Sequence, residues 1–100
     1  MKMVLAMEVK TSPTLTNGAF TVDFGDYEKV KNAIAMTQEP LGAVGDGKVL
    51  CFKTECSGND VTVTILKADM ETSTDTDRDW EYATTSDLSD KTVVVIADCE

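Results

Sequence analysis

Apolar and polar side chains alternate with a period of two along most of the chain, which predicts β-strands. The first such segment spans residues 3–9, and one of its faces carries only large apolar side chains: Met3, Leu5, Met7 and Val9. The opposite face carries a mixture: Val4, Ala6, Glu8 and Lys10. A strand is therefore expected at the start of the chain.

Two turn signals predict hairpins. Asn17-Gly18 favours a two-residue type I′ turn, because both residues tolerate a positive φ. Phe20, Val22 and Phe24 then alternate with polar residues, as in a half-buried strand. The turn at residues 57–60 separates two alternating segments and predicts a hairpin of 49–55 with 61–67.

The segment of residues 25–38 fits two interpretations. Tyr27, Val30 and Ile34 have helical spacing, so a short helix near residues 26–36 is one possibility. A strand with Val30, Asn32, Ile34 and Met36 on one face is the other. We favour the strand, because every neighbouring element is expected to be one.

The last third of the chain predicts a short strand, a turn and a final strand. Trp80 and Tyr82 lie on one face of the short strand, and residues 86–90 form a turn or a single helical turn. The unbroken apolar run of residues 93–97 predicts a central strand that is covered on both faces. The whole chain, residues 1–100, is thus expected to form one all-β domain, an antiparallel β-sandwich or small barrel of six to seven strands.

Composition and charge exclude several functions. The chain has 18 Asp and Glu, 9 Lys and Arg and no His, so its net charge is −9. Catalysis through His and zinc sites that use His are excluded. The negative charge argues against nucleic acid as a partner. No apolar run approaches the ~20 residues of a membrane span, so no membrane partner is expected.

The start of the chain does not fit a secretory signal. Its apolar run is interrupted by Glu8 and Lys10, which leaves it shorter than the ~7–15 residues that a signal needs. Secretion is therefore not expected, which leaves a cytoplasmic location. Cys51, Cys56 and Cys99 suit small buried hydrophobic residues in a reducing compartment, although Cys99 lies near the end of the sequence and could be exposed.

The acidic segment of residues 69–81 is a candidate cation site. Asp75, Asp77 and Asp79 alternate as in a calcium-binding loop, and carboxylate oxygens are the ligands that Ca²⁺ prefers. An EF-hand is excluded, because Trp80 stands where that loop requires Gly and Ser86 where it requires Glu. A weak Ca²⁺ site is therefore the alternative to a solvated acidic loop, and no other cofactor is expected.

Trp80 and Tyr82 are candidate ligand-binding residues. Two aromatic side chains on one strand face can stack on a sugar, although the single Trp can equally anchor the core or its rim. No pair of carboxylates stands out among the 18 acidic residues as a catalytic acid and base. We therefore expect no enzymatic activity.

A resemblance concerns the order of elements in the second half of the chain. Residues 61–68 form a strand, 80–84 an aromatic strand, and 87–98 a polar turn with an apolar strand. This order resembles small β-sandwich proteins of phages and proviruses, and residues 20–25 are compatible with it. The resemblance implies a virion-associated or accessory structural role, such as a head, decoration or fibre component.

These observations together predict a structural or interaction protein. It would contact a protein partner, or further copies of itself, through the edges or faces of its sheets. The alternative is a binding module for Ca²⁺ or a glycan that uses the 69–81 loop together with Trp80 and Tyr82.

Overall fold

The structure is a computed structural model that describes residues 4–38, 48–69 and 80–100. It contains seven strands: β1 (Val4–Thr11), β2 (Ala19–Asp23), β3 (Val30–Thr37), β4 (Lys48–Ser57), β5 (Asp60–Asp69), β6 (Glu81–Tyr82) and β7 (Thr92–Cys99). In the described ranges, the helical element is a single 3-10 turn, η2 (Thr85–Leu88). The prediction of an all-β fold is therefore confirmed.

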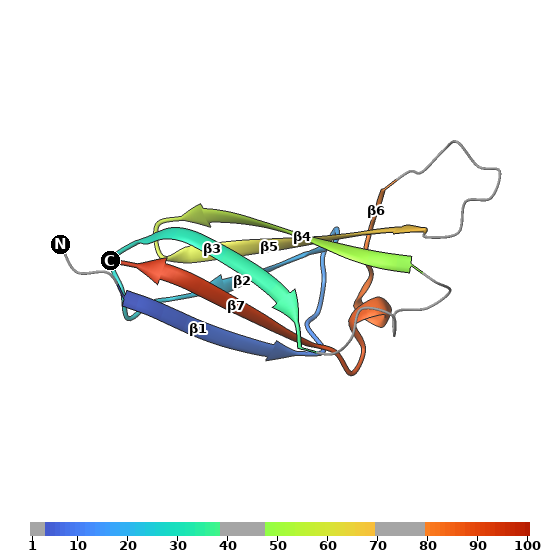
Figure 1. Ribbon diagram of the computed structural model, residues 1–100, viewed down its shortest axis with the longest axis horizontal. Coiled ribbons are helices and arrows are strands. Elements are labelled where there is room, and N and C mark those ends of the chain that lie inside the picture. The colour runs from blue at the N-terminus through green and yellow to red at the C-terminus, as the bar shows by residue number, and fades with distance from the viewer. Residues whose placement is uncertain (1–3, 39–47, 70–79) are drawn as a thin grey trace.

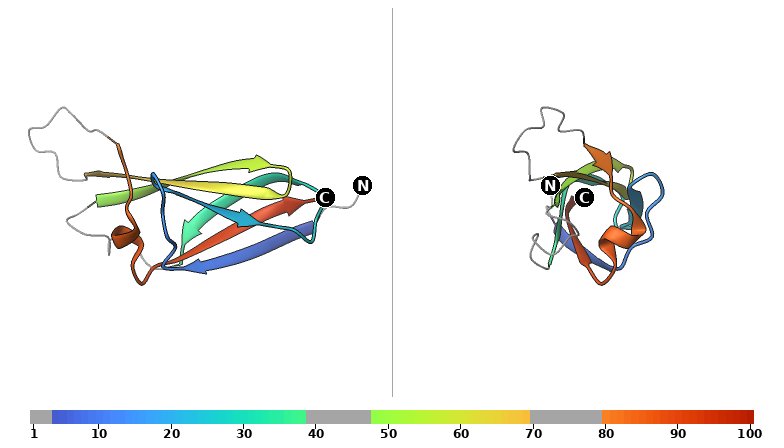
Figure 2. Two further views of the ribbon diagram at one scale, coloured as in Figure 1. Left: turned by 180° about the vertical axis from the view of Figure 1, so that it is seen from behind. Right: turned by 90° about the vertical axis from the view of Figure 1, so that its right-hand side faces the viewer.

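The strands form two antiparallel sheets that pack together. One sheet has the order β1-β7-β3, and its three strands lie side by side in Figure 1. The other has the order β2-β5-β4, with the short β6 also paired to β5. Figure 2 shows the strands end-on, enclosing the space between the two sheets. The fold is a sandwich, and it agrees with the predicted antiparallel architecture.

The core lies between the sheets. It is built from the inward residues of β5, β7 and β2, which alternate with exposed or half-buried ones as the period of two requires. The buried apolar residues are Val22, Phe24, Val30, Leu50, Val61, Val63, Ile65, Ala68, Ala83, Leu88, Val93, Val95, Ala97 and Cys99. One side of the sandwich is joined where the Thr54 hydroxyl, on β4, donates to the Ala33 carbonyl on β3 at 2.7 Å.

Both predicted turns are present, but only the second closes a hairpin of two paired strands, because β1 pairs with β7 and β2 with β5. Asn17 (φ 51°) and Gly18 (φ 76°) have the positive φ values that a type I′ turn requires. The peptide groups of Thr16 and Ala19 exchange hydrogen bonds of 2.9 and 3.0 Å across this turn. The β4–β5 hairpin closes at Gly58, whose φ is 60°.

The ambiguous segment forms strand β3, so the helix near residues 26–36 is wrong. The strand differs from the expected one in a single respect. Its register against β7 shifts between Val30 and Asn32, which makes Lys31 an extra residue, as in a β-bulge. Val30 is consequently buried, whereas Ile34 and Met36 lie on the outer face. The prediction that these three share one face is therefore wrong.

Strand β7 is the central strand of its sheet, as predicted, but it is not covered on both faces. Val93 and Val95 are fully buried in the core. Val94 and Ile96 point the other way and remain partly accessible. No described element packs over this outer side.

The cysteines do not behave as one group. Cys51 and Cys56 are exposed and Cys99 is buried, and all three thiols are free. The expectation that the first two are buried, and that Cys99 could be exposed, is therefore wrong. Cys99 is covered because its side chain points into the core from the central strand.

Candidate interaction surface

The sheet β1-β7-β3 places its small side chains inside and its large ones outside. Ala6, Ala33 and Ala35 face the core. The large neighbours of these alanines point into solvent: Leu5, Met7, Ile34 and Met36. This is the reverse of the usual distribution for a sheet that packs on one side only.

The outward residues form a compact block, which we call the apolar outer face. It consists of Leu5, Met7, Val9, Ile34, Met36, Val94 and Ile96. The strand register places Met7, Ile96 and Ile34 in one row across the sheet. The adjacent row contains Val9, Val94 and Met36. Two complete rows of the sheet are therefore apolar.

This face is large for a single domain of 100 residues. The exposed fractions are 71% for Leu5, 63% for Met7, 57% for Ile34, 46% for Val9 and 45% for Met36. Together these side chains leave on the order of 500 Å² of apolar surface in water, near the upper end of what monomeric proteins expose in one patch. Patches of that size commonly mark a site of contact with another molecule.

Rows that contain polar residues border the two apolar rows at both ends. At one end, Asp98 and Asn32 share a row with the apolar Leu5. At the other end the Thr11 and Thr92 hydroxyls lie 3.4 Å apart. An apolar centre with polar ends is the usual composition of a protein interface.

The outer face of the second sheet is different. Its centre carries hydroxyl and charged groups, which are the exposed Thr21, Lys53 and Glu55 and the half-buried Thr62 and Thr64, whereas the row nearer β6 carries Cys51, Leu66 and Tyr82. Among these, the Lys53 amine and the Glu55 carboxylate form an ion pair of 3.1 Å. The centre of this face is suited to contact with water, so Thr21 there provides a control position for experiments on the apolar outer face.

Asp98 has an unmet hydrogen-bonding capacity at the end of the apolar outer face. Its Oδ1 is buried, yet no group in the described residues donates to it. Asp98 lines a shallow hollow, whose other lining residues include Leu5, Asn32, Ile34 and Ile96. A buried acceptor without a donor is unusual in a native fold.

The free edge of β1 is less suited to pairing than the face. The Ser12 amide donates to the Lys91 carbonyl, so the peptide groups of even-numbered residues of β1 face β7. Because the direction alternates along an antiparallel strand, the peptide groups of Leu5, Met7 and Val9 point to the free edge. Glu8 and Lys10, however, lie on the core side of this strand, opposite Val95 and Val93. Charged residues on the inner side of an edge strand disfavour the addition of another strand.

The two predicted aromatic residues are both exposed. Trp80 has an exposed fraction of 53% and Tyr82 one of 58%. Tyr82 pairs with Leu66 of β5, and a hollow beside it is lined by Lys53, Thr64 and Glu81. The interpretation of Trp80 as a core anchor is therefore wrong, while a platform for a planar or sugar ligand keeps its geometric basis.

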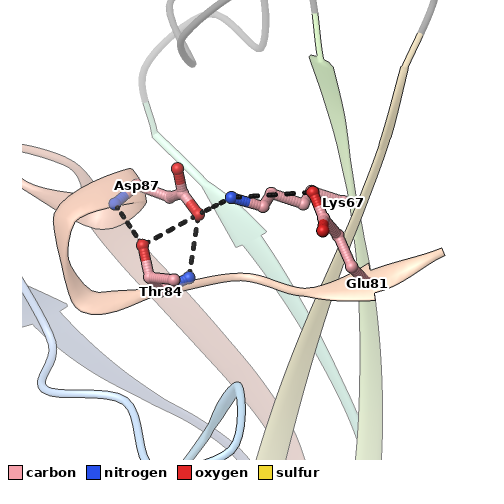
Figure 3. A network of polar contacts seen from close by, with 4 residues as sticks. All are labelled: Lys67, Glu81, Thr84 and Asp87. Carbon is pink, nitrogen blue, oxygen red and sulfur yellow. Dashed lines mark hydrogen bonds and ion pairs between the residues drawn. The ribbon is translucent and has the colours of Figure 1, made fainter.

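A polar network holds η2 against the second sheet (Figure 3). Asp87 Oδ2 accepts hydrogen bonds from Lys67 Nζ at 2.7 Å and from the Thr84 backbone at 2.8 Å, and the Thr84 hydroxyl caps η2 in return. Lys67 Nζ also lies 3.9 Å from Glu81. Burial alone would raise the pKa of Asp87, but the hydrogen bonds from Lys67 and Thr84 outweigh it, so the pKa is lowered.

The acidic cation candidate lies outside the described residues. Asp75, Asp77 and Asp79 fall in the segment 70–79, so the Ca²⁺ interpretation stays a prediction. In residues 4–38, 48–69 and 80–100, no cluster of three or more His, Cys, Asp or Glu could hold a metal. The same ranges contain no helix with the length and apolar character needed to cross a membrane.

Comparison with known proteins adds no relative. No family model, curated protein or solved structure matches the chain. The resemblance to phage and provirus proteins therefore stays a prediction.

Proposed function

We propose that this protein is a non-enzymatic interaction module that binds another protein molecule through its apolar outer face. The observation that carries the proposal is the exposure of Leu5, Met7, Ile34 and Met36 on strands whose core side holds alanines. Leaving such side chains in water forgoes roughly 25 cal/mol for each Å² that a partner would cover. A bound protein recovers that free energy.

The contrast between the two outer faces supports a one-sided contact. The hydroxyl and charged groups of the second sheet lose favourable hydration if they are covered without matching partners. The apolar outer face has no such groups in its two central rows. The molecule therefore docks with the β1-β7-β3 side and keeps the β2-β5-β4 side in water.

The resemblance to phage and provirus sandwich proteins suggests where such a module would work. Virion components assemble through repeated contacts between protein surfaces. A virion-associated assembly subunit is thus the specific form of the proposed function, and the docking face is its general form.

Photo-crosslinking in cells that encode the chain tests the proposal. Benzoylphenylalanine at position 34 lies on the apolar outer face, and the matched control at position 21 lies on the polar outer face. We expect an adduct to protein from position 34 and little or none from position 21. Equal or absent adducts at the two positions would overturn the proposal.

A second candidate function, glycan binding, is favoured by the exposure of Trp80 and Tyr82. Neighbouring exposed aromatic rings can stack on the apolar face of a sugar, and Lys53 and Glu81 are near enough to contact its hydroxyls. Because Trp80 is the only tryptophan, its fluorescence reports binding directly. A change that saturates with an oligosaccharide and disappears in Tyr82→Ala would support this function, and an unchanged spectrum across a panel would refute it.

A further inference from the structure

We infer that the molecule on the apolar outer face is a second copy of this chain, related by a twofold axis that lies in the interface and runs perpendicular to the strands. This inference rests on the proposed docking function and names its partner. The two β1-β7-β3 sheets would pack face to face with antiparallel strands. Two sheets that pack in this way lie about 10 Å apart.

The area of the face fits a pair of copies. Two apolar outer faces of on the order of 500 Å² each, with their polar end rows, bring the total buried area to the low end of a standard specific interface. A twofold contact also requires a surface that complements itself, and the apolar rows of this face meet that requirement.

Side-chain size matches across the proposed axis. With the axis between the two apolar rows, Ile96 of one copy faces Val94 of the other, and Met7 faces Val9. Each larger residue on these two strands therefore meets a smaller one. Complementary sizes of this kind allow the side chains of two packed sheets to interdigitate.

Charge selects the antiparallel arrangement. If the strands of the two copies ran in parallel, Asp98 would face Asp98 of the second copy across an apolar interface, which would repel. In the antiparallel arrangement, the row that contains Asp98 meets the row that contains Thr11 and Thr92 of the second copy. Hydroxyl groups of the second copy, in place of a second carboxylate, then lie opposite Asp98.

Sedimentation equilibrium of the purified chain tests the identity of the partner. Wild type is expected to form a dimer, whereas Ile34→Lys, and independently Met7→Lys, should weaken the dimer at least tenfold. Thr21→Lys makes the same charge change on the polar outer face and should leave the dimer intact. Far-UV circular dichroism confirms that each variant is folded, because both substituted face residues are exposed.

Spin labels at Asn32→Cys, in a background with Cys51 and Cys56 replaced by Ser, test the orientation. The rise per residue and the sheet spacing predict a separation of about 22 Å between the two labelled backbones in the antiparallel dimer and about 14 Å in the parallel one. A separation near the shorter distance would overturn the arrangement proposed here.

The outcomes separate this inference from the docking function. A chain that stays monomeric at millimolar concentration overturns the second copy as partner, and a dimer that both Lys variants leave intact overturns its place on the apolar outer face. If position 34 then crosslinks to a different protein, the docking function stands without the dimer. If it crosslinks to nothing, the docking function fails as well.

Discussion

The network around Asp87 gives the sharpest prediction for stability. Asp87→Asn should lower the free energy of unfolding by about 1–3 kcal/mol at pH 7, the usual worth of a hydrogen bond to a charged group. Asn keeps an oxygen that can accept from Thr84, but it removes the charge opposite Lys67 Nζ, which lies 2.7 Å away. The Lys67 side chain is only 14% exposed and would keep Glu81, at 3.9 Å, as its remaining carboxylate in this network.

The pH dependence of this loss follows from the lowered pKa of Asp87. A carboxyl whose pKa is lower in the folded chain stabilises the fold above its unfolded pKa, which is ordinarily 3.8. That stabilisation disappears as the pH falls through the lower, folded value. The difference between wild type and Asp87→Asn should therefore be full at pH 7 and shrink in strongly acidic solution.

Urea unfolding followed by far-UV circular dichroism measures both quantities. Asp90→Asn is the matched control, because it removes the same charge three residues away and Asn tolerates the positive φ of 60° at that position. The control should change stability by less than about 0.5 kcal/mol. If Asp87→Asn behaves like the control, or if its effect is the same at low and neutral pH, the assignment of this network is wrong.

Four further predictions concern the core, the turns and the cysteines. Ile65→Ala should cost about 2–5 kcal/mol in urea unfolding, because the side chain is fully buried. Gly58→Ala should cost about 1–2 kcal/mol for its positive φ. Gly18→Ala should cost about 1–3 kcal/mol more, because a new Cβ would lie 2.8 Å from Tyr82; equal costs at the two glycines would refute that contact. Cys99 is fully buried whereas Cys51 and Cys56 are exposed, so a thiol reagent should modify these two in the folded chain and Cys99 only on unfolding, as mass spectrometry of the labelled chain would show.

The sequence predicted the strands and their turns well because both are local properties. Alternation over five to eight residues identifies a strand, and Asn17-Gly18 identifies its turn without knowledge of the remaining chain. The bulge at Lys31 was not visible, since an extra residue is defined only against the partner strand β7. Because of this bulge, the side chains of Val30 and Ile34 lie on opposite faces of the sheet.

The candidate site was harder to predict because its members come from three strands far apart in sequence. Alternation assigns Leu5 and Met7 to one face, but it does not say whether that face is the inner or the outer one. The alternation of Ala33 and Ala35 with Ile34 and Met36 was the available signal, and it became informative once the strand order was known. The pairing of Lys67 with Asp87 likewise depends on tertiary structure.

The most direct test of the central claim is the oxidation of Met7 and Met36 by hydroxyl radicals, measured by mass spectrometry at two protein concentrations. Both methionines lie on the apolar outer face, while the exposed Trp80 directly precedes β6 of the second sheet and serves as the internal reference. In the concentrated, associated sample both methionines should oxidise several-fold more slowly than in the dilute monomer, with Trp80 unchanged. Association without any protection of Met7 and Met36 would show that the contact lies elsewhere and would contradict the account.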